Sequence, residues 1–268
     1  MKKTALLSLA LSTLLMGADE VKEISSFVTH TELSYVRTQG NTDTTAFSVD
    51  FTGTQKINDI AIKLDLDALY GDEKSIENKN KFLGEINLDY HISDHFTINY
   101  LYGYKNDKFS GFDSQQYTGP GVKLIAVASN VHNLDFQANA LYSQDDEMNS
   151  YYTDETKSEQ IKYPYPNGLE GAYLDPESGD VRSYTGYIGK FSYNWQITKS
   201  FKFLQEANYR GDFENSDNYF AFSKTAVESK IASILSLGIS YKADYTNQPP
   251  AGNVYTDTTF MTSLIIDY

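Results

Sequence analysis

Sixteen charged side chains occupy alternate positions along successive segments of the sequence, and they are the residues best placed to do chemistry. They are Glu32, Asp50, Lys63, Asp65, Asp67, Lys81, Glu85, Asp89, Lys105, Lys190, Lys202, Glu206, Arg210, Glu228, Lys242 and Asp244. Acidic and basic residues are interleaved, which leaves two interpretations open. The charges either form ion pairs that fill a narrow interior, or they line a water-filled passage and tune its selectivity.

The four histidines are the next candidates for catalysis or metal binding. His30 is expected to point inward near the start of its strand. His91 and His95 flank a short turn, and His132 follows another one. All four lie far from the outer rim, where barrel enzymes carry catalytic groups, and no Gly-x-Ser-x-Gly elbow or metalloprotease helix motif is present. We therefore predict no catalytic residue, no cofactor, no metal site and no enzymatic activity; a hydrolase at the rim is the weakest alternative.

A long acidic segment, residues 145–183, is the third candidate. Its acidic residues are Asp145, Asp146, Glu147, Asp154, Glu155, Glu159, Glu170, Asp175, Glu177 and Asp180. Carboxylates bind hard cations such as calcium, but the spacing matches no known calcium loop, which favours solvated surface charge. The stretch Tyr163 to Pro166 is expected to be locally stiff and to fold over the mouth of the protein.

The segments that position these side chains alternate with a period of two, which is typical of β-strands with one apolar and one polar face. Phe47, Val49 and Phe51 alternate with Ser48 and Asp50, for example. About twelve such strands are expected, with ten or fourteen as alternatives: 27–37, 44–55, 60–71, 81–92, 96–105, 116–127, 131–144, 184–197, 201–211, 219–231, 234–245 and 256–268. Pro120 predicts a bulge in one strand, and 219–231 alternates too poorly to fix its register.

The links between these strands fall into two classes. Short links (56–59, 93–95, 128–130, 198–200, 232–233) alternate with longer polar ones (38–43, 72–80, 106–115, 145–183, 212–218, 246–255). Strands of this length cross a tilted membrane span, and short periplasmic turns alternate with long extracellular loops in outer-membrane barrels. The fold class predicted is an all-β, transmembrane, antiparallel, up-and-down β-barrel. A soluble β-sandwich is the main structural alternative.

Aromatic residues gather near the strand ends, as expected for two membrane-interface belts. The periplasmic belt would hold Phe27, Tyr90, Phe96, Trp195, Phe201 and Tyr268, and the outer belt Tyr70, Phe82, Tyr104, Tyr142, Tyr187, Tyr209, Tyr245 and Phe260. Unpaired backbone amides are costly in lipid, so the first strand must pair with the last.

Residues 1–18 read as a signal peptide, because two lysines precede a short apolar run. Residues 19–26 would be a short periplasmic segment, and 27–268 a single barrel domain. The chain carries a formal net charge of -14 and no cysteine. This composition disfavours nucleic-acid binding and excludes disulfides and thiolate metal sites.

The carboxy-terminal residues Tyr268, Ile266, Leu264 and Phe260 share one face and are similar to the signal by which bacterial barrels are recognised for assembly. Further residues resemble the salt-induced outer-membrane proteins, a family of unknown function. They are Leu33, Ser34 and Tyr35 followed by Gly40, Asn41 and Thr42; 105–113 followed by Gly119, Pro120 and Gly121; and 241–250 followed by Asp257 and Thr258. The resemblance implies an outer-membrane location and no established activity.

Two functions from different classes follow. The first is a small passive channel or structural barrel in the outer membrane of a Gram-negative bacterium. The second is a surface adhesion or recognition protein that acts through the acidic loop 145–183. Expected partners are outer-membrane lipid, lipopolysaccharide and the barrel-assembly machinery, and a monomer is expected because a closed sheet has no free edge.

Overall fold

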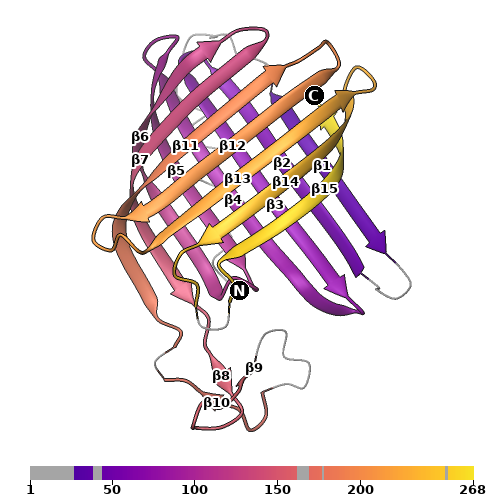
Figure 1. Ribbon diagram of the computed structural model, residues 1–268. Helices are drawn as coiled ribbons and strands as arrows, with labels where there is room; N and C mark the ends of the chain where they lie inside the picture. Colours follow the sequence, from indigo (N-terminus) through magenta and orange to yellow (C-terminus); the bar gives the residue numbers. More distant parts are fainter. Residues whose placement is uncertain (1–26, 39–43, 162–168, 177, 251–252) are drawn as a thin grey trace, which may run out of the picture.

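Twelve antiparallel strands close into a single barrel in the computed structural model (Figure 1). The structure describes residues 27–38, 44–161, 169–176, 178–250 and 253–268. The barrel strands are β1 (Val28–Thr38), β2 (Thr44–Ile57), β3 (Ile60–Glu73), β4 (Ile76–His91), β5 (Phe96–Asp107), β6 (Phe112–Ala128), β7 (His132–Glu147), β11 (Val181–Gln196), β12 (Phe201–Asp212), β13 (Tyr219–Lys230), β14 (Leu235–Thr246) and β15 (Thr256–Asp267). The predicted strand number and fold class are confirmed. The predicted signal peptide and the segment 19–26 lie outside the described residues.

The barrel closes by pairing its first and last strands. Each barrel strand pairs with the one before and the one after it along the chain. Strand β7 pairs with β11, since β8, β9 and β10 lie outside the barrel, and β1 pairs antiparallel with β15. The backbone N–H of Thr29 donates to the carbonyl of Tyr268 at 2.6 Å, and the N–H of Tyr268 donates back at 2.9 Å. The sheet therefore has no open edge, as a strand in lipid requires.

The outer face of the barrel is apolar and the inner face is mostly polar. On β5, the outward side chains of Ile98 and Tyr100 are exposed. The inward Thr97, Asn99 and Leu101, which alternate with them, are buried. A soluble protein buries its apolar face, whereas a membrane barrel turns that face toward lipid. The described residues contain no helix long and apolar enough to cross a membrane.

A row of stacked tyrosines follows one end of strands β11 to β14. Tyr187 and Tyr209 have ring centroids 6.0 Å apart, Tyr209 and Tyr219 are 5.1 Å apart, and Tyr245 continues the row 5.8 Å from Tyr219. Three of these four rings belong to the predicted outer belt. Their regular spacing marks the height at which the barrel would meet one membrane interface.

Several strands extend further than their sequence pattern predicted. The link 72–80 was expected to be long, but β3 and β4 are joined by Lys74 and Ser75 alone, both with positive φ (52° and 65°). Likewise 106–115 shortens to four residues, 108–111, and 145–183 to 148–180. The strict alternation of short and long links is therefore wrong. A strand segment that projects beyond the membrane needs no apolar face. A polar sequence therefore does not by itself mark the end of a strand.

Two further predictions concern strand register. The expected bulge at Pro120 is wrong, because the β6–β7 pairing keeps one register from Thr118 opposite Tyr142 to Gly121 opposite Asn139. The irregularities of β6 lie elsewhere, between Phe112 and Ser114 and between 125 and 127. Strand β13, whose register the sequence left open, pairs without interruption with β12 and β14.

The segment between β7 and β11 forms a small three-stranded sheet of β8 (Tyr151–Tyr152), β9 (Gln160–Ile161) and β10 (Tyr173–Leu174). Figure 1 shows this sheet beyond one end of the barrel. The stiff stretch predicted from Tyr163 to Pro166 lies outside the described residues.

Candidate functional site

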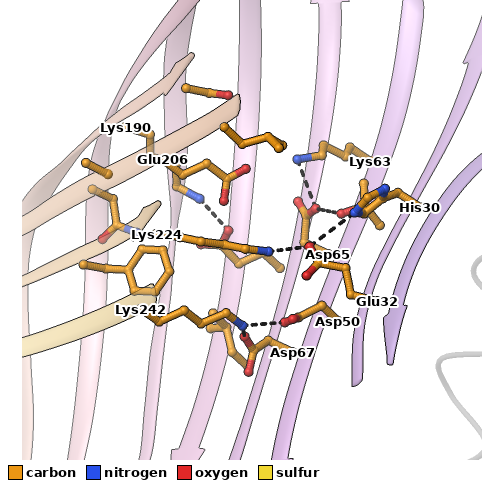
Figure 2. Close-up of a pocket in the computed structure, with 18 of the residues that line it drawn as sticks. His30, Glu32, Asp50, Lys63, Asp65, Asp67, Lys190, Glu206, Lys224 and Lys242 are labelled. Carbon is orange, nitrogen blue, oxygen red and sulfur yellow. Dashed lines mark hydrogen bonds and ion pairs between the residues drawn. The ribbon is translucent and has the colours of Figure 1, made fainter. Parts of the chain in front are cut away.

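The barrel encloses a cavity of about 1080 Å³ that is lined by charged side chains from most of its strands (Figure 2). Eleven Lys and Arg and ten Asp and Glu line it. The whole chain, in contrast, contains 22 basic and 36 acidic residues. The interior is therefore nearly balanced in charge, and the acidic excess of the chain lies outside it.

Fifteen of the sixteen interior charges predicted from the sequence lie on the wall of this cavity. The exception is Asp89, which is buried and accepts an ion pair from Lys123 at 2.7 Å. Lys123 lines the cavity and was missed by the sequence analysis, as were Lys224 and Asp135. Lys224 is four residues from Glu228 on one strand and shares its face, so extending the period of two would have found it.

Ion pairs link strands that are not neighbours in the sheet. On β14, Lys242 donates to Asp50 at 2.7 Å and also to Asp67, and Figure 2 shows its ammonium group between the two carboxylates. Lys190 of β11 pairs with Glu85 of β4 in the same way. These contacts cross the interior instead of following the wall, so they narrow the lumen.

One group of contacts connects opposite walls. Asp244 of β14 accepts an ion pair from Lys81 of β4 at 2.8 Å, and the ammonium of Lys105 on β5 lies 3.8 Å from the same carboxylate. Strands β14 and β5 are six positions apart in the ring of twelve in either direction. At this level side chains from both sides of the barrel meet, so the passage is constricted.

A packed cluster next to this level adds to the constriction. The Arg210 guanidinium lies 4.9 Å from the ring of Tyr117 and 4.3 Å from that of Phe220. Its Nη2 lies 3.4 Å from Asp145. Tyr117 also packs in a buried apolar cluster with three aliphatic side chains: Leu101, Leu141 and Ile188. An apolar cluster inside a membrane barrel excludes water from that part of the lumen.

Asp145 corrects the predicted loop boundary. It was grouped with the acidic loop, but it lies on β7 and is buried. Besides Arg210, it accepts hydrogen bonds from Tyr184 at 2.8 Å and from Gln115 at 3.1 Å. Asp146 and Glu147 also belong to β7. The sequence missed this because the alternating apolar pattern ends at Tyr142, while the polar face continues.

Within the remaining loop, the acidic residues hold local structure. Lys157 pairs with Asp175 at 2.8 Å. Asp154 accepts hydrogen bonds from the hydroxyls of Ser158 and Thr156 and from their backbone N–H groups, which lowers the pKa of its carboxyl to about 2. These contacts describe an ordered turn at the surface.

The histidines lie near one end of the barrel. His91 contacts the Thr97 hydroxyl at 2.8 Å, and His95 contacts the Ile125 carbonyl at 2.9 Å. His132 bonds the Tyr193 hydroxyl at 2.9 Å and stacks on Trp195 of the outer face. His30 alone lines the cavity, as its predicted inward direction requires.

Comparison with solved structures gives membrane barrels at low sequence identity. The NanC porin shares 10% identity with a TM-score of 0.44, over 90% of this chain and 97% of that one. The KdgM porin shares 7% with a TM-score of 0.40, over 91% and 99%. The channel DcaP of Acinetobacter baumannii shares 8% with a TM-score of 0.37, over 95% and 100%. Similarity at this level carries no information on function.

Among curated proteins, no sequence matches this chain significantly. One protein family does match, over residues 31–268, and its description is "Protein of unknown function, DUF481". That description makes no reference to salt, so the narrower resemblance to the salt-induced proteins stays a prediction. Because the match covers nearly all of the barrel, the chain belongs to the DUF481 family.

Proposed function

We propose that this protein is an outer-membrane channel of low conductance for small polar solutes, with a lumen constricted by ion pairs that cross it. The charge-lined cavity of about 1080 Å³ inside a closed barrel is the observation that carries the proposal. A barrel with a purely structural role needs no such polar space, because its interior could be filled by packed side chains.

The distribution of charge inside the lumen supports passage of solutes of either sign. Basic and acidic side chains are nearly equal in number along the wall, so neither cations nor anions meet a strong opposing field. The constriction formed by Lys81, Lys105 and Asp244 favours small solutes. The proposal assigns no catalytic role to any of these residues.

Asp244→Ala tests the constriction. Loss of this carboxylate frees the ammonium groups of Lys81 and Lys105 from the opposite wall. We expect the single-channel conductance in planar bilayers to rise about twofold or more, with a shift toward anion selectivity because two cations lose their counter-ion.

Glu155→Gln is the matched control, since it removes one negative charge from the exposed part of the loop. It should leave conductance unchanged. Bilayers that stay silent with folded wild-type protein and with folded Asp244→Ala would contradict the channel proposal and leave a structural barrel.

The location and partners belong to the same proposal. The apolar outer face suits contact with outer-membrane lipid and lipopolysaccharide, and the closed sheet suits a monomer. A surface adhesion role for the loop has only the charge and length of that loop in its favour, and it stays a prediction.

Deletion of Tyr268 tests the proposed assembly signal. Among the described residues, Tyr268 is the most exposed of the large apolar side chains, and it makes two backbone hydrogen bonds to β1. We expect a several-fold drop in the amount of folded barrel in outer membranes, measured as the compact band of unboiled samples in detergent gels. Tyr268→Phe keeps the ring and the backbone, and should assemble normally; equal yields for the deletion and the wild type would refute the signal.

A further inference from the structure

His30 lies between two carboxylates at the seam where the barrel closes. Its Nδ1 is 2.7 Å from Asp267 of β15, and its Nε2 is 3.2 Å from Glu32, two residues along β1. A neutral imidazole has one N–H donor, so only one of these contacts can be a hydrogen bond. The other places a ring lone pair against a carboxylate oxygen. This arrangement requires either one more proton, on the ring or on a carboxyl, or a bound cation.

Glu228 of β13 provides a second and independent sign of a missing ligand. Its side chain is only 6% exposed, and its Oε1 is buried without a hydrogen-bond partner among the described residues. Its other oxygen, Oε2, accepts an ion pair from Lys202 at 3.2 Å. A buried carboxylate oxygen without a partner is costly, and an unfilled cation site is one of the explanations for such an atom.

These groups converge on one point. One ligand atom each from His30, Glu32 and Glu228 lies within 4.8 Å of the other two. Around a tetrahedral zinc ion with bonds of about 2.0–2.2 Å, ligand atoms lie roughly 3.5 Å apart. Side-chain movements of about 1 Å would therefore bring these three atoms to the spacing of zinc ligands and leave the fourth position of a tetrahedral site open.

We propose that His30, Glu32 and Glu228 form a binding site for a divalent transition-metal ion, for which Zn²⁺ is the best fit. An imidazole nitrogen with two carboxylates suits zinc, whereas calcium and magnesium prefer oxygen ligands alone. Asp267 acts as a positioning residue, because its contact with Nδ1 leaves Nε2 free for the metal. Metal-binding histidines commonly donate the N–H of their other ring nitrogen to a carboxylate in this way.

The site joins strands that are apart in the sheet. His30 and Glu32 come from β1 and Glu228 from β13, and β15 and β14 lie between them. A bound ion would therefore link β1 to β13, across the β1–β15 pair at which the barrel closes. Lys224, also on β13, donates to Glu32 (Figure 2), so this ammonium competes with the metal for that carboxylate.

Zinc binding by the full chain, folded in detergent and stripped with a chelator, tests the proposal. We expect one Zn²⁺ per chain by isothermal titration and elemental analysis, and a higher temperature of unfolding with zinc than without. His30→Gln and Glu228→Gln should each weaken binding at least about tenfold, and Asp267→Asn by a similar factor. Lys224→Met should strengthen binding, since it removes the competing cation.

His132→Gln is the matched control, because this histidine faces outward near the same end of the barrel. It should bind zinc as the wild type does. Co²⁺ in place of zinc should give visible absorption bands that disappear in His30→Gln. If wild-type protein binds no more zinc than His30→Gln, or if a folded Glu228→Gln variant binds it equally well, the site is an ion-pair cluster around a protonated histidine and the proposal is wrong. Should His30→Gln fail to fold, the comparison of wild type with Glu228→Gln decides.

Discussion

Gly119→Ala is expected to prevent the barrel from closing, or to lower its free energy of unfolding by more than about 3 kcal/mol. A Cβ at this position would lie 1.8 Å from the carbonyl oxygen of Ala140 and 3.1 Å from the Cα of Leu141. Both are backbone atoms of β7, which no side-chain rotation can move away. The whole of β6 would have to shift, and the pairing of β6 with both neighbours would be disturbed.

Gly189→Ala is the control for this prediction. It changes the same residue type on β11, but its Cβ would meet no atom within 4 Å. Its effect on stability should stay within about 0.5 kcal/mol. Unfolding in urea can be followed through Trp195, the one tryptophan in the sequence. If the Gly119 variant folds with wild-type stability, the close approach of β6 to β7 is wrong.

Gly119 also explains why Pro120 does not break its strand. The sequence led us to expect a bulge, because proline cannot donate to the ladder. Instead, Gly119 and Gly121 on either side let β7 come close, and the register stays unbroken. A single sequence does not reveal how near the neighbouring strand lies, so this outcome could not be read from residue types.

The strands themselves were predictable because lipid imposes a strict pattern. On β5, only one strand register places the apolar side chains toward lipid and the alternating polar side chains toward the interior. Where the strands leave the apolar belt, as at Lys74 and Ser75, that constraint is absent. The link lengths at this end were therefore mispredicted, although the strand order was correct.

The sequence predicted which side chains face the interior, but it did not predict which of them contact one another. Period two placed Lys81 and Asp244 on the inner face, yet their ion pair joins residues 163 positions apart. Which charges meet across a lumen depends on the diameter, tilt and stagger of the barrel. None of these is encoded in local spacing. The same reason hid the convergence of His30 with Glu228.

Arg210→Met is expected to lower the free energy of unfolding by roughly 3 kcal/mol, because it leaves Asp145 buried without a cation. The side chains of Arg210 and Asp145 are 6% and 4% exposed. Tyr184 and Gln115 still donate to Asp145 in the variant, but neither carries a charge to offset its own. Methionine keeps most of the packing volume between the rings of Tyr117 and Phe220. A loss of stability of this size would therefore come mainly from the loss of the positive charge.

The double variant Arg210→Met with Asp145→Asn separates charge from packing. It removes both charges and keeps the shape of each side chain, so we expect it to be more stable than Arg210→Met alone by about 1 kcal/mol or more. The stability of Arg210→Lys should lie between those of the wild type and Arg210→Met. Its ammonium group keeps the charge but lacks the planar stacking of a guanidinium on the Tyr117 ring. If the double variant is no more stable than Arg210→Met, the aromatic contacts of Arg210 outweigh its ion pair. In that case stacking of Arg210 on the rings of Tyr117 and Phe220 holds this cluster together, and Asp145 contributes through its hydrogen bonds from neutral donors alone.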